Sequence, residues 1–104
     1  MSNKKYNIKY LPSAQQDLNE IISYLQTDSP EYGEKLIDKI DNEISQLKSF
    51  PYKGKTPEDE NLKNKRYRMI IIDNYIIFYV IFENDETVEI RRIIHGKRRY
   101  KFLL

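Results

Sequence analysis

Residues 66–94 read RYRMIIIDNYIIFYVIFENDETVEIRRII, and this stretch decides the fold. Runs of branched and aromatic residues are typical of β-strands, and the polar pairs at 73–74 and 84–85 are typical of tight turns. The middle run is apolar on both faces, which predicts a strand inside the sheet and not at its edge. The stretch therefore predicts an antiparallel meander of three strands, at 66–72, 75–83 and 86–94.

The residues before the meander predict one more strand and two helices. Residues 5–11 alternate between polar and apolar side chains, which indicates a strand. Apolar residues then recur at helical spacing up to about residue 26, and again from Pro30 to the Phe50-Pro51 pair. Ser13 and Gln16 have the spacing of a capping box at the start of the first helix, and Ser29 before Pro30 is typical of the start of the second.

The element order is therefore β-α-α-β-β-β. The short break between the helices predicts an antiparallel helical hairpin. We expect an α+β fold in which this hairpin packs on one face of an antiparallel sheet, as a single domain over residues 1–104. Residues 52–64 are polar and hold three consecutive acids, so we expect a loop there, either a solvated, mobile surface segment or part of a binding rim.

Composition excludes several classes of site. The chain has no cysteine and one histidine, His95, so a disulfide, a cysteine nucleophile and a zinc site are all excluded. The three glycines are scattered and form no phosphate-binding loop, so we expect neither a metal nor another cofactor. No apolar run is long enough to span a bilayer, and the first residues do not resemble a secretory leader, so we expect no membrane partner and a cytoplasmic location.

Positive charge gathers toward the C-terminus. Residues 1–60 carry 8 Lys or Arg and 11 Asp or Glu, whereas residues 61–104 carry 10 and 5. Within 91–101 there are six cations and no acid. A basic segment of this kind indicates either a polyanionic target or an acidic protein partner.

An ordered set of motifs runs through nearly the whole chain. They are Tyr10-x-x-x-Ala14-x-x-Asp17-Leu18-x-x-Ile21, Leu47-x-x-Phe50-Pro51, Arg68, Asn74-Tyr75-Ile76-Ile77-Phe78-Tyr79 and Arg92-Ile93-Ile94-His95-Gly96-x-Arg98. No single motif is specific, but this set in a chain of this length resembles the RelE/ParE toxin superfamily.

The resemblance implies the growth-inhibiting toxin of a type II toxin–antitoxin system, a class associated with plasmid stabilisation. It implies a hetero-oligomer with a small antitoxin, usually encoded beside the toxin. It also implies one of two targets: RelE-like members cut mRNA on the ribosome without a metal, and ParE-like members poison DNA gyrase without chemistry. From the charge pattern we expect an acidic, amphipathic antitoxin segment across the sheet or the helical hairpin.

RNA cleavage would need a proton acceptor, a proton donor and cations that stabilise the charged phosphorane. For a nuclease, the candidate catalytic residues are Arg68, His95, Arg98 and Tyr100. In a meander, Arg68 and His95 are expected to share one face, about 10 Å apart across two strand spacings. Candidates for binding RNA or another target are Arg66, Arg91, Lys97, Arg99 and Lys101.

Each candidate also has a purely structural interpretation. Arg68 could be solvated or paired with Asp73 or Glu89, and His95 could be an ordinary hydrogen-bonding residue at a strand end. Tyr67 and Tyr100 are the better candidates among the tyrosines for stacking on a base, although Tyr100 could equally be a packing residue.

One departure from the nuclease pattern bears on the choice of target. Ile76 stands where RelE-like nucleases carry an arginine, and the stretch 74–79 resembles the ParE pattern. In the other direction, Arg98 matches an arginine that the nucleases use at the scissile phosphate, and Arg99 replaces an acid usual in ParE-like chains. The sequence slightly favours a gyrase poison, while an mRNA endoribonuclease and a non-toxic member of the fold remain alternatives.

Overall fold

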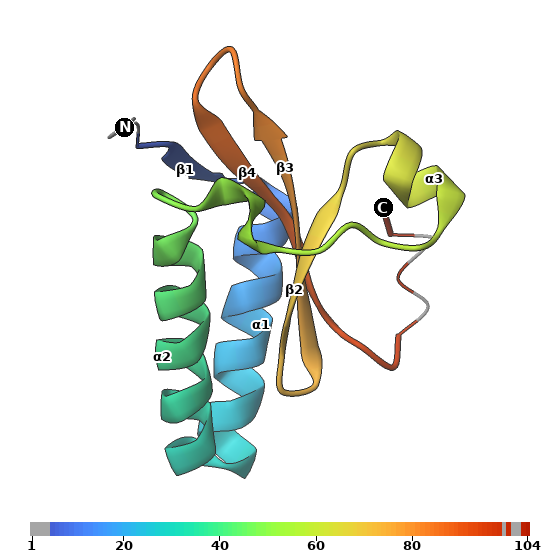
Figure 1. Ribbon diagram of the computed structural model, residues 1–104. Coiled ribbons are helices and arrows are strands. Elements are labelled where there is room, and N and C mark those ends of the chain that lie inside the picture. Colours follow the sequence, from blue (N-terminus) through green and yellow to red (C-terminus); the bar gives the residue numbers. More distant parts are fainter. Residues whose placement is uncertain (1–4, 99, 101–102) are drawn as a thin grey trace.

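The computed structural model describes residues 5–98, 100 and 103–104. Figure 1 shows one sheet between two layers: a pair of long helices covers one face, and a short helix with the C-terminal residues lies on the other. Arg99 and Lys101, two of the predicted target-binding residues, lie outside the described residues. The elements are β1 (Asn7–Tyr10), α1 (Pro12–Asp28), α2 (Pro30–Gln46), η1 (Pro51–Lys53), α3 (Glu60–Asn64), β2 (Arg68–Ile72), β3 (Tyr75–Phe82) and β4 (Thr87–His95).

The sheet has the strand order β1-β4-β3-β2. The predicted antiparallel meander and its internal middle strand are confirmed, with β3 paired to β2 and to β4. Strand β1 pairs with the opposite side of β4 in parallel. The turn at 73–74 is also confirmed, and Asp73 adopts a left-handed conformation there, with φ 52°.

The helical hairpin is confirmed, but the capping box at Ser13 is wrong. Helix α1 begins at Pro12, with Leu11 as its N-cap, because proline suits the first helical position. Ser13 is therefore inside the helix, and its hydroxyl donates to the carbonyl of Arg91 over 3.1 Å. Ser29 precedes α2 as predicted, although its side chain makes no capping hydrogen bond.

The segment 52–64 is more ordered than a solvated loop. It contains most of η1 and all of α3. The Asp59 carboxylate accepts from the Leu62 amide at 3.1 Å, so one member of the acidic run caps α3. Leu62 is buried against the sheet face opposite the hairpin.

Side chains on the two faces of the sheet form two separate cores, because successive residues of a strand point to opposite faces. The larger core lies between the sheet and the hairpin, and it includes Leu36, Ile40, Ile77 and Tyr79. The smaller core lies on the other face, around Phe78 and Ile94, and includes Leu62 and Tyr67, with Tyr100 packed against it. None of the helices in the described part of the chain is long and apolar enough to cross a membrane.

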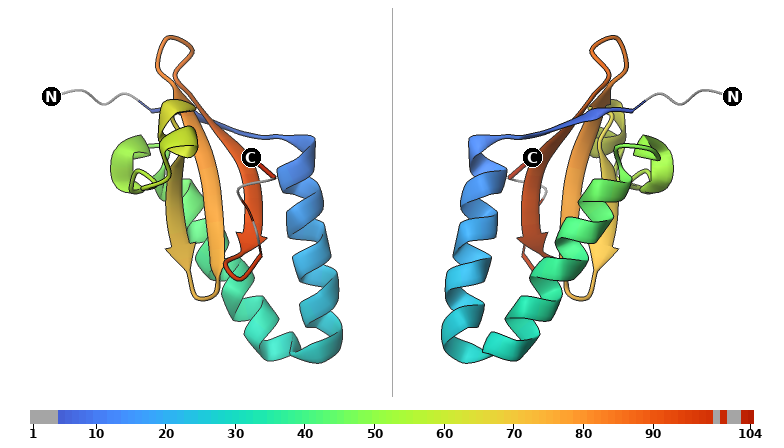
Figure 2. Two further views of the ribbon diagram at one scale, coloured as in Figure 1. Left: turned by 90° about the vertical axis from the view of Figure 1, so that its right-hand side faces the viewer. Right: turned by 90° about the vertical axis from the view of Figure 1, so that its left-hand side faces the viewer.

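Asp17 on α1 joins the hairpin to the open edge of β4. Strand β1 pairs only with Thr87–Ile90, and α1 runs beside the rest of β4, as Figure 2 shows. The Asp17 carboxylate, only 7% exposed, accepts from the Ile93 amide at 3.0 Å. It also accepts from Arg92 through Nε at 2.7 Å and Nη2 at 2.8 Å. The carboxylate thus replaces the missing strand neighbour and neutralises a half-buried guanidinium.

Replacing Asp17 by alanine is expected to lower the free energy of unfolding by about 3–5 kcal/mol, because Arg92 and the Ile93 amide lose their acceptor. Urea unfolding followed by circular dichroism measures this. Asp38→Ala, an exposed change on α2, is the control and should stay within about 0.5 kcal/mol of the unaltered chain. Equal stability of the two variants would contradict the role given to Asp17.

Candidate functional site

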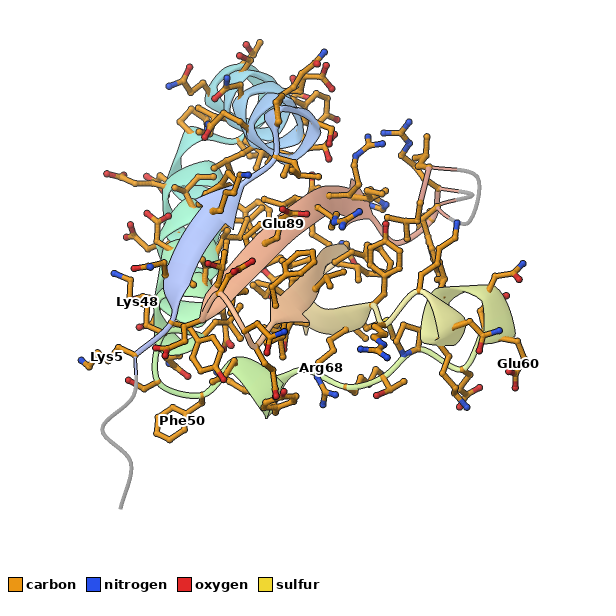
Figure 3. The ribbon with its side chains drawn as sticks, turned by 90° about the horizontal axis from the view of Figure 1, so that it is seen from above. Lys5, Lys48, Phe50, Glu60, Arg68 and Glu89 are labelled. Atoms are coloured by element: carbon orange, nitrogen blue, oxygen red, sulfur yellow. The ribbon has the colours of Figure 1, made fainter. Side chains whose placement is uncertain are left out.

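Arg68 at the start of β2 is neither solvated nor paired with Asp73 or Glu89. Its guanidinium donates from Nε and Nη2 to the Gly54 carbonyl, at 3.1 and 2.6 Å, and from Nη2 to the Tyr52 carbonyl at 3.1 Å. It also lies over the Tyr52 ring, 5.3 Å from the ring centre. Figure 3 shows Arg68 between the sheet and the loop that carries these carbonyls. The residue therefore positions a loop.

Tyr79, the β3 neighbour of Arg68, holds the same loop. Its hydroxyl donates to the Pro51 carbonyl at 2.7 Å and accepts from the Gly54 amide at 2.9 Å. A Cβ at Gly54 would lie 2.5 Å from that hydroxyl, so only glycine fits. Burial raises the pKa of Tyr79, partly offset by the Gly54 amide and Arg68.

His95 lies at the other end of the sheet from Arg68. The pairing places Arg68 beside Tyr79, whereas His95 lies beside Tyr75, four residues away along β3. Both side chains belong to the hairpin face, as predicted, but the register separates their Cα atoms by about 16 Å, not 10 Å. The predicted distance of 10 Å counted only the spacing between strands. It left out the offset of four residues along β3, which the lengths of the turns do not determine.

Contacts of His95 are confined to its own end of the sheet. Its Nδ1 accepts from the Lys97 amide at 3.2 Å, and its ring meets the Tyr75 ring edge-on at 5.2 Å. Lys97 and Arg98 follow directly and are exposed. The histidine and two cations therefore share one turn.

Tyr100 lies on the opposite face of the sheet from Arg68. Its ring is 5.1 Å from that of Phe78, which alternates with Tyr79 along β3. Tyr67 is buried beneath the same face, so it is not available for the base stacking considered for it. Of the four candidate catalytic residues, Arg68 lies apart from the other three. Backbone hydrogen bonds join Arg98 to His95 at 3.0 Å and Tyr100 to Arg98 at 2.8 Å, but the Tyr100 ring packs on the face opposite that of His95.

The candidate target-binding cations are also divided. Arg91 pairs with Glu89 at 2.7 Å and lies over the Tyr67 ring. Arg66 is exposed at the end of the sheet where β2 begins, and Lys97 at the end where β4 finishes. Among the described residues, the candidate target-binding cations therefore do not form one surface.

Sequence reasoning missed an aromatic group on the helical hairpin. Tyr24 on α1 is 62% exposed, and Tyr32 on α2 donates to Asp73 at 3.0 Å. That hydrogen bond, with another from Lys39, lowers the pKa of Asp73. The helical spacing could have indicated Tyr24, which falls outside the apolar stripe of α1, but not Tyr32, which continues the apolar stripe of α2.

The same tyrosines lie near Tyr75, which is the cross-strand neighbour of His95. The hydrogen bond to Asp28 is the main cause that raises the pKa of Tyr24, and burial is the main cause that raises the pKa of Tyr32. The Tyr75 hydroxyl raises both pKa values further. Tyr75 in turn contacts His95. We name the resulting group the hairpin-end surface; it consists of Tyr24, Tyr32, His95, Lys97 and Arg98.

A metal centre has no donor set in the described residues, where no three His, Asp or Glu side chains gather to hold an ion.

Three comparisons with known proteins address identity. A family model described as the ParE toxin of the type II toxin–antitoxin system parDE matches residues 8–100. No curated protein matches the chain.

Solved structures show the same fold. The chromosomal ParDE toxin–antitoxin system from P. aeruginosa is similar with a TM-score of 0.69 and 17% identity, covering 89% of this chain and 98% of that one. The toxin–antitoxin complex RelBE2 from Mycobacterium tuberculosis is similar with a TM-score of 0.63 and 19% identity, covering 90% and 94%.

Replacing Arg68 by lysine is expected to lower the free energy of unfolding by about 1–2 kcal/mol, because an ammonium group cannot reproduce the planar fork to two carbonyls. Urea unfolding measures the loss, and limited proteolysis should show faster cleavage within residues 51–56. Arg66→Lys, on the exposed residue two positions earlier, is the matched control. If both variants behave like the unaltered chain, Arg68 does not hold the loop.

Proposed function

The chain belongs to the ParE toxin family of type II toxin–antitoxin systems, and we propose that it inhibits bacterial growth by poisoning DNA gyrase. It is a type II toxin of the RelE/ParE superfamily, and its partner is an antitoxin. The choice of gyrase over the ribosome is the proposal.

The observation that carries it is the separation of the candidate catalytic groups. A general acid and a general base must each lie within hydrogen-bond reach of the reacting atoms. Arg68 is held by loop carbonyls, about 16 Å along the sheet from His95, and Tyr100 packs on the other face. A gyrase poison needs no such convergence, because it acts by binding.

The hairpin-end surface suits binding to a protein–DNA complex. Exposed tyrosines and arginines are enriched in protein interfaces and in their energetic centres. Lys97 and Arg98 add cations that can contact phosphates beside the protein. Aromatic and cationic groups at one end of the molecule therefore match a target that presents both protein and DNA.

Cleavage of mRNA on the ribosome is the second candidate, and one observation favours it. The turn after β4 places His95 next to the exposed Lys97 and Arg98, so one potential proton-transfer group lies beside cations. Tyr75, whose ring lies 5.2 Å from that of His95, is a second group that could transfer a proton there, so this turn and Tyr75 would have to supply the reaction.

Purified chain, added to gyrase, ATP and plasmid DNA, is expected to trap gyrase-linked breaks, seen as linear plasmid after detergent and protease treatment. The double variant Lys97→Ala/Arg98→Ala should need at least tenfold more protein for the same yield, because it removes two phosphate contacts. Lys9→Ala/Lys48→Ala, at exposed positions on β1 and just after α2, removes the same charge elsewhere and is the control.

A parallel reaction with ribosomes and mRNA is expected to leave the transcript intact. Transcript cuts that His95→Ala abolishes, with no gyrase-linked breaks, would overturn the proposal in favour of the nuclease. Normal growth of cells that produce the chain without antitoxin, together with neither activity, would identify a non-toxic member of the fold.

A further inference from the structure

A cleft of about 590 Å³ lies at the end of the sheet opposite the hairpin-end surface. One wall is the start of β2, and the other is the turn between β3 and β4. A shallower groove formed by Ser49–Lys53 adjoins it, and both depressions share Tyr52. We name the larger depression the β2 cleft; its main lining residues are Tyr52, Arg66, Arg68, Phe82, Glu83 and Asp85.

Aromatic side chains are unusually exposed in and beside the β2 cleft. Tyr52 is 51% exposed and Phe82 38%, and Phe50 in the adjoining groove is 66% exposed. Single exposed apolar residues are common on proteins, but several in one depression indicate a binding surface. Large rigid aromatic side chains beside arginine are the typical composition of a protein interface.

The β2 wall of the cleft is positively charged. The Arg68 guanidinium has neutral hydrogen-bond and ring partners: the Tyr52 and Gly54 carbonyls, the Thr56 hydroxyl and the Tyr52 ring. These hydrogen bonds fix the guanidinium but do not cancel its charge. Arg66 is exposed on the same wall, in a left-handed conformation with φ 64°, and no ion pair neutralises it within the described part of the chain.

The opposite wall is negatively charged, since Glu83 and Asp85 lie on the β3–β4 turn. A nucleic acid presents the same charge throughout its backbone, so it would be attracted by one wall and repelled by the other. A polypeptide segment can instead place an acid against the arginines, a base against the turn, and an apolar side chain between them.

We propose that the β2 cleft is an anchoring site for the antitoxin, and that it binds a segment with a large apolar side chain between an acidic and a basic residue. The proposal rests on the antitoxin partnership of the family and not on the gyrase target. It differs from the expectation from sequence, which placed the antitoxin across the sheet or the hairpin, over the basic C-terminal residues.

Single-cysteine variants test the site directly, because the chain contains no cysteine of its own. Phe82→Cys places a thiol in the cleft, and Tyr24→Cys places one on the distant end of α1. Each variant is purified alone and in complex with the cognate antitoxin, identified as the protein whose coexpression restores growth. The rate of alkylation by iodoacetamide is then measured for each form.

Antitoxin is expected to slow alkylation of Phe82→Cys at least tenfold, and to slow it more than alkylation of Tyr24→Cys. An unchanged rate at position 82 would overturn the proposal, and so would equal protection of both positions, which indicates general coverage. Protection of Phe82→Cys by a 20-nucleotide RNA without antitoxin, or by raising the concentration of the chain alone, would identify another occupant and also overturn it.

Charge reversal gives an independent measurement. Arg66→Glu is expected to raise the Kd for antitoxin at least tenfold, whereas Arg66→Lys should restore most of the affinity, because the site needs a cation there. Lys35→Glu makes the same change of charge on α2 and is the matched control. Equal Kd values for Arg66→Glu and Lys35→Glu would overturn the proposal. Neither measurement involves gyrase, so a failure of the proposed target leaves both interpretable.

Discussion

Strand β4 is nine residues long, but β1 pairs with only four of them, and the structure depends on how the remaining edge is satisfied. An unpaired amide or carbonyl in a buried position is costly, so the edge needs other partners. Helix α1 supplies them through the Ser13 hydroxyl and the Asp17 carboxylate. The same carboxylate neutralises Arg92, so one side chain fixes α1 against the sheet and holds a partly buried cation.

This attachment gives the molecule two different ends. Helix α1 is fixed beside β4. The junction of the two helices and the turn that follows β4 therefore lie toward the end of the sheet where His95 is paired with Tyr75. The opposite end carries the β3–β4 turn and the start of β2. Aromatic and charged residues gather at both ends, and they differ in pattern. On the hairpin-end surface the tyrosines bind Asp28 and Asp73, and the cations follow β4, whereas the β2 cleft has walls of opposite charge.

The loop over β2 shows that an arginine in one of the family motifs, Arg68, has a structural role. Arg68 and Tyr79 occupy neighbouring strands at the same level, and together they hold the carbonyls and amides of residues 51–54. A loop of this kind cannot pair its own backbone groups, so strand side chains satisfy them. The arrangement orders Tyr52, which in turn lines the β2 cleft. The hydrogen bonds of Arg68 thus hold the loop, and its positive charge contributes to the wall of the β2 cleft.

Local sequence determined the elements of this protein. Alternation, helical spacing and the turn at 73–74 act between residues close in the chain, and they predicted the meander, the internal strand β3 and the helical hairpin. The lack of cysteine likewise determined that the chain has no thiolate chemistry. The spacing of Ser13 and Gln16 predicted a capping box, because a local pattern contains no information about residues distant in sequence. In the structure the Ser13 hydroxyl instead donates to the carbonyl of Arg91.

Tertiary structure alone decided which residues meet. The parallel pairing of β1 with β4, the Asp17–Arg92 pair and the separation of Arg68 from His95 depend on strand order and register. Strand order and register are set by the packing of the whole sheet against α1 and α2. Contacts between residues far apart in the chain produce no periodic pattern in the sequence from which they could be predicted. Composition could count the cations of the C-terminal segment, but only the register could distribute them between two ends of the molecule.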